Sequence, residues 1–371
     1  MNIVGINISH DTSVCLMQDG KIIFYLEEER LCKVKSFLIH KIPAQIKILD
    51  KIKNFVDKID YLIISTYKRE NPQSDVVISE DIVNTILKQG IVIHKIILDL
   101  DNHHLHHAYN AFYFSGFDSA SVLVMDHSGS YDTNYSQQIN NELSFVNNEL
   151  SFAREIESIY KFDNNLHKKL FKHYTTFNIK RFFHEVFNYF IPNNDEDVIS
   201  NAYSVGELFF SVTKFLGLHH LDAGKTMGMS SYGVLDKEKI EWFCERENNV
   251  FFNCKFLKDL EFSKLYLSAS FQEQADFAKK LQYETKEYTI RLIQKAINLS
   301  NSSNVVLSGG YFQNCVNNYA YLKAFPNVNF YVDPICYDGG TAIGACLYVW
   351  HNILGNPNTL QKLDNLYLGP E

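Results

Sequence analysis

The sequence predicts an α/β protein made of two related units. An apolar segment followed by a polar turn opens each unit, at residues 2–8 and again at 119–125. In the last third, apolar segments at 304–307 and 329–332 each lead through a glycine-containing turn into a helical pattern, which is typical of a doubly wound sheet. The chain has 371 residues, of which 46% are hydrophobic and 14% aromatic, so it can bury more than one core.

The first unit is expected to begin with three short strands joined by tight turns. Its residues 18–20, with the sequence Gln-Asp-Gly, are a hairpin signal between the second and third strands. Pro43 favours a helix that begins near it, because proline is well tolerated in a first helical turn. The expected elements are strands at 2–8, 13–17, 21–26, 60–65 and 91–98, and helices at 43–56 and from residue 103 onwards.

The second unit is expected to contain an insertion. Residues 154–245 are rich in aromatic side chains and include a polar loop at 192–197, and we expect a mostly helical segment there. A sustained helical period predicts one long helix at 271–299, and a shorter helix is expected at 313–324, after the strand and glycine turn that precede it. The expected division is a first unit at 1–117, a second unit at 118–355 and a C-terminal segment at 356–371.

Charge, hydropathy and cysteine spacing exclude several classes of protein. The formal net charge of −8 argues against a broad phosphate-binding surface, so a nucleic-acid partner is not expected. No apolar stretch approaches the ~20 residues of a membrane span, and no signal peptide precedes the first strand. Seven cysteines without a C-x-x-C pair suit free thiols in a reducing compartment, so we expect a cytoplasmic protein.

Four histidines lie within five positions after the strand expected at 91–98. On a helix, His103 and His107 would stand one turn apart on one face, close enough to bind one metal ion or an anion. His104 and His106 would face elsewhere, so the four imidazoles cannot share one ion. The alternative is a histidine-rich helix start in which the rings cap or solvate the first turn. A metalloprotease site is disfavoured because position 104 is not glutamate.

Two aspartates at the ends of separate strands could complete such a site. Asp126 follows the strand at 119–125, and Asp338 lies in a glycine-rich turn before the last helix. Two imidazoles and two carboxylates suit a hard or borderline divalent cation. For each aspartate taken alone, a turn or a helix cap is the alternative interpretation.

Three further segments could carry chemistry. Gly309, Gly310 and Asn314 combine bare backbone with a helix start where a nucleotide could lie. The segment from Gly224 to Gly228 offers Lys225 to an anionic group, with a plain surface lysine as the alternative. A P-loop is excluded because six residues, not four, separate Gly217 from Gly224. The pair His10–Asp11 lies in the first turn, where a turn cap and a polar rim residue are the simpler interpretation.

Together these segments resemble the O-carbamoyltransferases of the nodulation and antibiotic-tailoring type. The resemblance covers nearly the whole chain, with its motifs in the family's order. The matching segments are 5–13, 27–30, 103–108, 224–228 with 231–233, 308–315, 338–344 and 368–370.

The resemblance implies the actin–hexokinase–sugar-kinase fold, in which two RNase H-like lobes hold a nucleotide in the cleft. It implies transfer of a carbamoyl group from carbamoyl-adenylate, made from carbamoyl phosphate and ATP, to a hydroxyl of a small-molecule, sugar or natural-product acceptor. It also implies a metal site, with Fe²⁺, Mn²⁺, Zn²⁺ and Mg²⁺ all open. The residues implied are His103, His107, Asp126 and Asp338 for the metal, His10 and Asp11 for catalysis, and Lys225, Gly228, Gly309, Gly310, Asn314 and Gly339 for the adenylate.

Members of this family usually continue beyond the segment 368–370 into a YrdC-like domain that makes the adenylate. We therefore expect this chain to act as a transfer domain that receives its adenylate from a separate domain or protein. We expect it not to support ATP–pyrophosphate exchange driven by carbamoyl phosphate. Two alternatives are threonylcarbamoyl transfer to tRNA, which the acidic balance disfavours, and a non-catalytic nucleotide-binding subunit, which the complete set of ligands disfavours.

Overall fold

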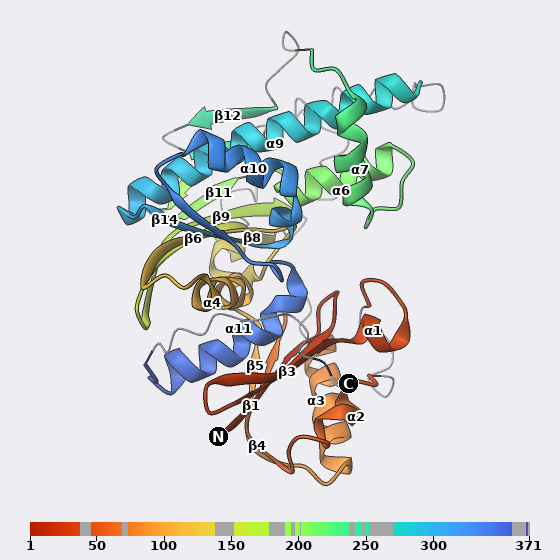
Figure 1. Cartoon of the computed structure of the whole chain (residues 1–371), viewed down its shortest axis with the longest axis vertical. Helices are drawn as coiled ribbons and strands as arrows, with labels where there is room; N and C mark the ends of the chain where they lie inside the picture. Colours follow the sequence, from red (N-terminus) through yellow and green to blue (C-terminus); the bar gives the residue numbers. More distant parts are fainter. Residues whose placement is uncertain are drawn as a thin grey trace.

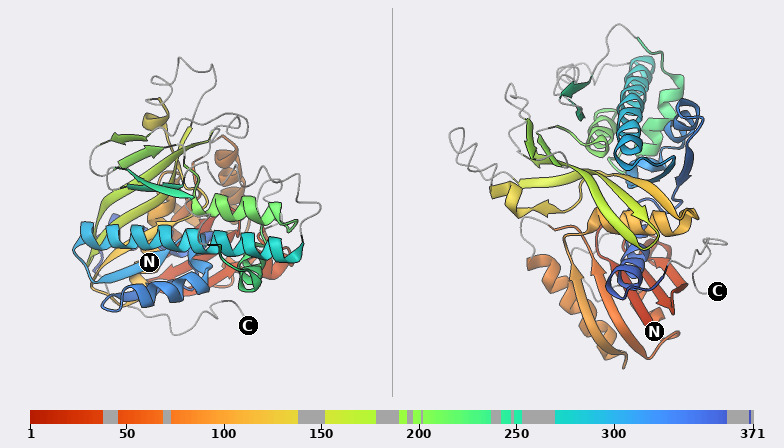
Figure 2. Two further views of the ribbon diagram at one scale, coloured as in Figure 1. Left: turned by 90° about the horizontal axis from the view of Figure 1, so that it is seen from above. Right: turned by 90° about the vertical axis from the view of Figure 1, so that its left-hand side faces the viewer.

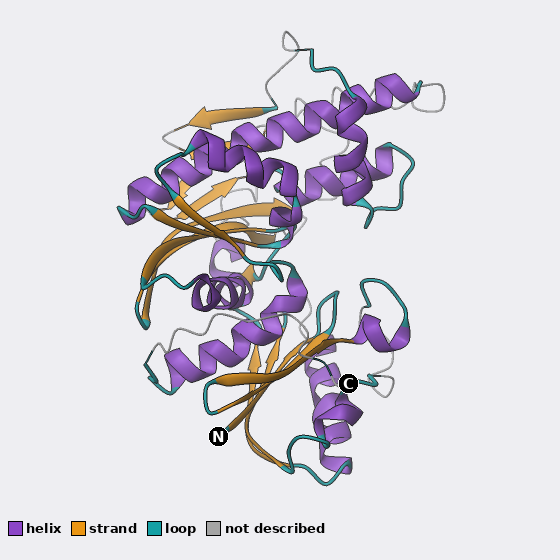
Figure 3. Ribbon diagram, viewed as in Figure 1, coloured by secondary structure: helices purple, strands orange, loops and turns teal. Residues whose placement is uncertain are grey.

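The described part of the computed structural model has two large β-sheets, with helices between and outside them, and a small two-stranded sheet of β12 (Phe243–Arg246) and β13 (Asn249–Phe252) (Figure 1). Helices lie in the layer that separates the two sheets and cover the outer faces of both (Figure 3). The structure describes residues 1–37, 46–68, 73–137, 152–177, 190–193, 197–200, 202–236, 242–246, 249–252, 270–357 and 369.

The first sheet has the order β3-β2-β1-β4-β5 in the described part of the chain. Its first three strands are antiparallel neighbours, whereas β1, β4 and β5 run parallel. The helix predicted at 43–56 lies partly outside the described residues, and its described part contains only a short α2. The elements are β1 (Asn2–Asn7), β2 (Ser13–Gln18), β3 (Lys21–Glu27), α1 (Glu28–Cys32), α2 (Leu49–Ile52), β4 (Lys58–Ser65), α3 (Gln73–Lys88) and β5 (Val92–Asp99).

The second sheet repeats this pattern. Strands β9, β8 and β6 are antiparallel neighbours, and β6, β14 and β15 run parallel, so the order β9-β8-β6-β14-β15 mirrors that of the first sheet. The prediction of two related units is thereby confirmed. The strands are β6 (Ser119–Met125), β7 (Tyr131–Asp132), β8 (Phe152–Asp163), β9 (Leu166–Phe177), β10 (Phe190–Asn193), β11 (Asp197–Ser200), β14 (Asn304–Ser308) and β15 (Asn329–Val332).

The prediction of a mostly helical segment at 154–245 is wrong over its first part. Strands β8 and β9 form a long antiparallel hairpin there, and the α-helices among the described residues of this segment are α6 (Val205–Phe215) and α7 (Ala223–Met229). Charged residues of this hairpin pair inside the sheet, as Glu155 does with Lys172. A central strand buried on both faces also loses the polar–apolar alternation that identifies strands.

Two helices, one from each of the two expected units, lie between the sheets. Helix α4 (His103–Ser115) and helix α11 (Thr341–Leu347) share one apolar core with side chains from both sheets. Their backbones approach so closely that a Cβ on Gly344 would lie 1.8 Å from the carbonyl oxygen of His106, so glycine is required there. The segments that carry the histidines and Asp338 are thus packed against each other.

The outer face of the second sheet is covered by α9 (Phe271–Ser300) and α10 (Cys315–Ala324) (Figure 2). Both helices were predicted from the sequence, and α9 was predicted from its helical period. Ser270 and Glu273 form a capping box that fixes the start of α9, and Asn314 caps α10. No helix among the described residues is long and apolar enough to cross a membrane.

Candidate metal centre

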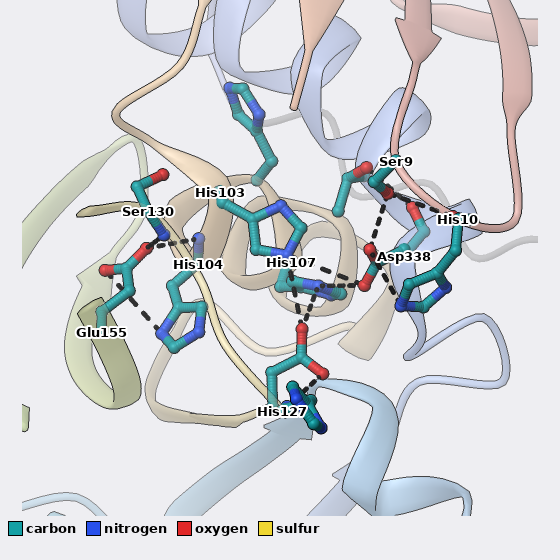
Figure 4. A network of polar contacts seen from close by, with 12 residues as sticks. Ser9, His10, His103, His104, His107, His127, Ser130, Glu155 and Asp338 are labelled. Carbon is teal, nitrogen blue, oxygen red and sulfur yellow. Dashed lines mark hydrogen bonds and ion pairs between the residues drawn. The ribbon is translucent and has the colours of Figure 1, made fainter. Parts of the chain in front are cut away.

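The four predicted metal ligands converge at one buried point between the lobes (Figure 4). The first turn of α4 supplies His103, and the next turn supplies His107. Asp126 follows the end of β6, and Asp338 lies in the turn before α11. One ligand atom from each residue lies within 4.8 Å of the other three.

The spacing of these atoms fits a shared cation. His103 Nε2 lies 3.3 Å from Asp126 Oδ2 and 3.7 Å from Asp338 Oδ1, and His107 Nε2 lies 3.6 and 3.5 Å from the same two oxygens. Donor atoms bound to one ion at ~2.1 Å stand about 3.0–3.5 Å apart. Within the described residues, His107 Nε2 and Asp338 Oδ1 are buried without a hydrogen-bond partner. The donor set therefore fits a divalent metal.

The carboxylates and imidazoles of this cluster shift one another's pKa values against the effect of burial. Burial raises the pKa of Asp126, but the His103 and His107 imidazoles beside it outweigh burial and hold that pKa well below its usual range. Burial lowers the pKa of His107, yet Asp126 and Asp338 raise it to about 9. A proton on His107 thus provides part of the positive charge that a divalent cation would supply.

The other oxygen of each carboxylate is held by a hydrogen bond. Asp338 Oδ2 accepts the Ser9 hydroxyl at 2.6 Å, and Asp126 Oδ1 accepts the His127 backbone N–H at 2.8 Å. Ser9 in turn is fixed by Asn7, whose side-chain oxygen accepts the backbone N–H of Ser9 at 3.0 Å. Sequence analysis missed these orienting contacts because nothing in the local pattern marks them.

The pair His10–Asp11 lies beside the ligands. His10 Nδ1 is 2.7 Å from Asp11 Oδ2, and its Nε2 is 3.5 Å from Asp338 Oδ2. Asp338 is the main cause that raises the pKa of His10 to about 10, against the lowering effect of burial. Asp11 has a positive φ of 61°, a conformation that aspartate tolerates better than most residues. The structure therefore brings the two predicted catalytic residues to the four predicted ligands.

A cavity of about 520 Å³ opens onto these groups and is lined from both lobes. His10, Asp11, Asp126 and Asp338 form part of its wall. Sequence analysis missed its aromatic and aliphatic lining, because such side chains could be interpreted only as core. These additional lining residues include Tyr67, Phe209, Phe210, Leu221, Met227 and Tyr311.

The residues predicted to hold the adenylate divide into two groups. Gly310 and Asn314 line the cavity, but both atoms of the Asn314 amide are already hydrogen-bonded to Gln282. Lys225, Gly228, Gly309 and Gly339 are not among the described residues of the cavity wall. Contact between these residues and a nucleotide stays a prediction.

Two residues of the second group have other contacts. The Lys225 ammonium is largely exposed and lies 2.7 Å from Asp222. Gly309 has a positive φ of 98°, and a Cβ there would lie 2.1 Å from the carbonyl oxygen of Met125, so packing requires glycine.

The other two histidines of α4 face away from the ligands, as their spacing predicted. His104 Nδ1 lies 2.8 Å from the Ser158 hydroxyl on β8. His106 Nδ1 lies 2.7 Å from the Ser65 hydroxyl on β4. These contacts tie helix α4 to both sheets.

The family model described as carbamoyltransferase N-terminus matches residues 2–347. The chain belongs to the carbamoyltransferase family. It is 23% identical over 394 residues to the nodulation protein NolNO of Sinorhizobium fredii, a match that covers 98% of this chain and 49% of the relative. It is 24% identical over 177 residues to the nodulation protein NolO of Bradyrhizobium diazoefficiens, covering 45% of this chain and 32% of the relative. The chain spans about half the length of the curated relatives it matches, with 60% coverage for a Synechocystis protein.

Among solved structures, two HypF proteins have the same fold. Full-length HypF in a phosphate- and nucleotide-bound form superposes with a TM-score of 0.56 at 14% identity, covering 96% of this chain and 56% of HypF. HypF of T. kodakarensis superposes with a TM-score of 0.56 at 11% identity, covering 95% of this chain and 48% of that HypF chain. The predicted actin–hexokinase–sugar-kinase fold with two RNase H-like lobes is confirmed.

Proposed function

We propose that this chain forms the transfer site of an O-carbamoyltransferase. It would move a carbamoyl group from carbamoyl-adenylate to a hydroxyl of a small-molecule, sugar or natural-product acceptor. The observation that carries the proposal is the convergence of His103, His107, Asp126 and Asp338 beside His10, on the wall of a cavity in a chain of the carbamoyltransferase family.

The cavity is the proposed adenylate site. Its volume of about 520 Å³ falls in the range of small-molecule pockets, and its aromatic lining, with Phe209 and Tyr311, suits a nucleobase. At Gly310 the chain exposes bare backbone beside Asp126, and a Cβ there would come within 3.2 Å of that carboxylate. A HypF structure of the same fold is described as phosphate- and nucleotide-bound, which supports a nucleotide in this chain.

The buried ligand set is the proposed metal site. His103, His107, Asp126 and Asp338 would hold Fe²⁺, Mn²⁺, Zn²⁺ or Mg²⁺, and the two imidazoles favour the first three over Mg²⁺. A bound divalent cation supplies positive charge for the adenylate phosphate and for the oxygen of the carbamoyl group.

His10 is the proposed base. With its Nδ1–H donated to Asp11, its Nε2 can accept the proton of the acceptor hydroxyl. The acceptor oxygen bonds to the carbamoyl carbon, the bond from that carbon to the phosphate oxygen breaks, and AMP leaves. Because Asp338 is the main cause of the raised pKa of His10, the imidazole becomes an effective base once the charge of Asp338 is compensated.

We place formation of the adenylate outside this chain, in a YrdC-like domain or partner protein. The proposal is tested by incubating the chain with such a domain, ATP, carbamoyl phosphate, Mn²⁺ and a panel of alcohols, with mass spectrometry to detect O-carbamoyl products. We expect acceptor-dependent AMP release that the chain alone does not give, and its loss in His103→Ala. Transfer that persists in His103→Ala, or transfer to tRNA instead of small alcohols, would overturn the proposal.

A further inference from the structure

A buried carboxylate lies behind the metal-binding helix and touches two segments that carry ligands. Glu155 on β8 is 1% exposed. Its Oε1 accepts the backbone N–H of Ser130 at 3.1 Å and that of His104 at 3.4 Å (Figure 4). Ser130 belongs to the loop that begins at Asp126, and His104 belongs to the first turn of α4. One oxygen therefore joins the loop to the helix.

The backbone of β8 holds the same loop. Glu155 accepts the N–H of Gly129 at 2.7 Å and donates its own N–H to the carbonyl of Ser130 at 3.1 Å. Asp126 donates its N–H to the carbonyl of Ile156 at 3.2 Å, where the register between β8 and β9 shifts. Such bulges re-aim side chains next to functional sites. Strand β8 is thus hydrogen-bonded along the loop, including the predicted ligand Asp126.

Helix α4 lacks the usual cap at its start. Its N-cap residue, Asn102, makes no side-chain hydrogen bond to the first turn, and that turn has no acidic residue. The first N–H groups of a helix need acceptors and favour a negative charge. The Glu155 carboxylate on β8 accepts the N–H of His104, and so it provides a hydrogen-bond acceptor and a negative charge at the start of α4.

The carboxylate is held charged in the interior. Burial raises the pKa of Glu155, but His104 and the Lys172 ammonium outweigh it and lower that pKa to about 2. Lys172 on β9 bonds the second oxygen, Oε2, and is itself mostly buried. The ion pair with Lys172 therefore holds the Glu155 carboxylate in a fixed position between the loop and the helix.

We propose that Glu155 is a positioning residue for the metal centre. By joining the first turn of α4 to the loop after β6, it sets the distance from His103 and His107 to Asp126. The inference rests on the proposed metal-dependent function, because it concerns the geometry of the same ligand set. Orienting partners of this kind contribute on the order of 10–100-fold to metal affinity.

The chain offers a matched control two residues along the strand. Glu157 is also 1% exposed, and its carboxylate bonds His173 and the Tyr288 hydroxyl. Its described hydrogen bonds reach neither α4 nor the loop at Asp126. Loss of the Glu157 charge should therefore disturb the core of this lobe without moving the ligands.

The experiment titrates Co²⁺ into purified wild type, Glu155→Gln and Glu157→Gln and follows the visible absorption of bound cobalt. We expect Glu155→Gln to weaken Co²⁺ binding by about 10–100-fold and to alter the spectrum. We expect Glu157→Gln to keep the wild-type Co²⁺ affinity and spectrum, even if it lowers the melting temperature as much as Glu155→Gln does. Equal affinity in wild type and Glu155→Gln, or equal loss in both variants, would overturn the inference.

A second variant covers the case in which Glu155→Gln does not fold. Glu155→Asp keeps the charge beside Lys172 but withdraws it by about 1.5 Å, the length of one carbon–carbon bond, from the two N–H groups. We expect the same loss of Co²⁺ affinity, and wild-type affinity here would overturn the inference. If the wild-type protein binds no Co²⁺, the proposed metal-dependent function itself is contradicted. Failure of the inference on Glu155 can therefore be distinguished from failure of the proposed function.

Discussion

The Ser9 hydroxyl donates a hydrogen bond of 2.6 Å to Asp338 Oδ2, although the two residues are 329 positions apart. Ser9 belongs to the first loop of the chain, and Asp338 belongs to the turn that opens its last helices. The bond joins the two lobes at the metal centre. It leaves Asp338 Oδ1 directed at His103 and His107.

Removal of this bond should weaken metal binding. In Ser9→Ala, Asp338 loses the partner that fixes its orientation, so we expect metal affinity to fall by about 10-fold. The measurement is a Co²⁺ or Mn²⁺ titration. Ser13→Ala is the matched control, because Ser13 also bridges the lobes, to the carbonyl of Gly339 at 2.7 Å, without touching a ligand. An equal loss in both variants would mean that lobe contact, not ligand orientation, is responsible.

Loss of the proposed base should slow transfer without releasing the metal. We expect His10→Gln to lower kcat by about 10²–10⁴-fold, since the hydroxyl proton then has no acceptor. Asp11→Asn should give a smaller loss because the imidazole remains but its tautomer is no longer fixed. Single-turnover carbamoyl transfer measures both, with metal content as the control. A His10→Gln protein with wild-type kcat would contradict the assignment.

The metal-free protein should become less stable as the pH rises. Asp126 and Asp338 outweigh burial and raise the pKa of His107 to about 9, whereas an unfolded histidine titrates near 6.5. The folded state therefore binds more protons in this interval, so the stabilisation is complete below pH 6.5 and is lost as the pH passes 9. Thermal melts of metal-free protein from pH 6 to 9.5 measure the effect. Stability that rises over this range would contradict it.

Glycines on and off the cavity wall should respond differently to alanine. A Cβ on Gly310 would come within 3.2 Å of Asp126 inside the cavity, whereas a Cβ on Gly228 meets nothing within 4 Å. We expect Gly310→Ala to weaken binding of AMP. We expect Gly228→Ala, in helix α7, to leave AMP binding unchanged and to stabilise the fold by up to ~1 kcal/mol. Weaker AMP binding in Gly228→Ala would restore the nucleotide role that the motif suggested.

Elements and ligands that depend on local spacing could be predicted from the sequence. Turn signals and apolar runs predicted β1, β2 and β3, and the spacing of His103 and His107 predicted one shared helix face. Asp126 follows strand β6 and Asp338 precedes helix α11, so the ends of those elements indicated where the carboxylates would meet the histidines.

Contacts between distant segments could not be predicted in the same way. Ser9 meets Asp338, and Glu155 meets the first turn of α4, only after the lobes and strands have packed. The hairpin of β8 and β9 was mistaken for helix because its charges, such as Lys172, pair inside the sheet. Burial of charge is a tertiary property, and local hydropathy does not reveal it.

The most direct test of the metal centre is a crystal structure of the Mn²⁺-loaded protein with anomalous scattering. We expect one ion, with Nε2 of His103 and His107 and the facing oxygens of Asp126 and Asp338 at about 2.0–2.3 Å. An ion bound elsewhere, or a loaded crystal in which these four side chains make no contact with manganese, would contradict the account.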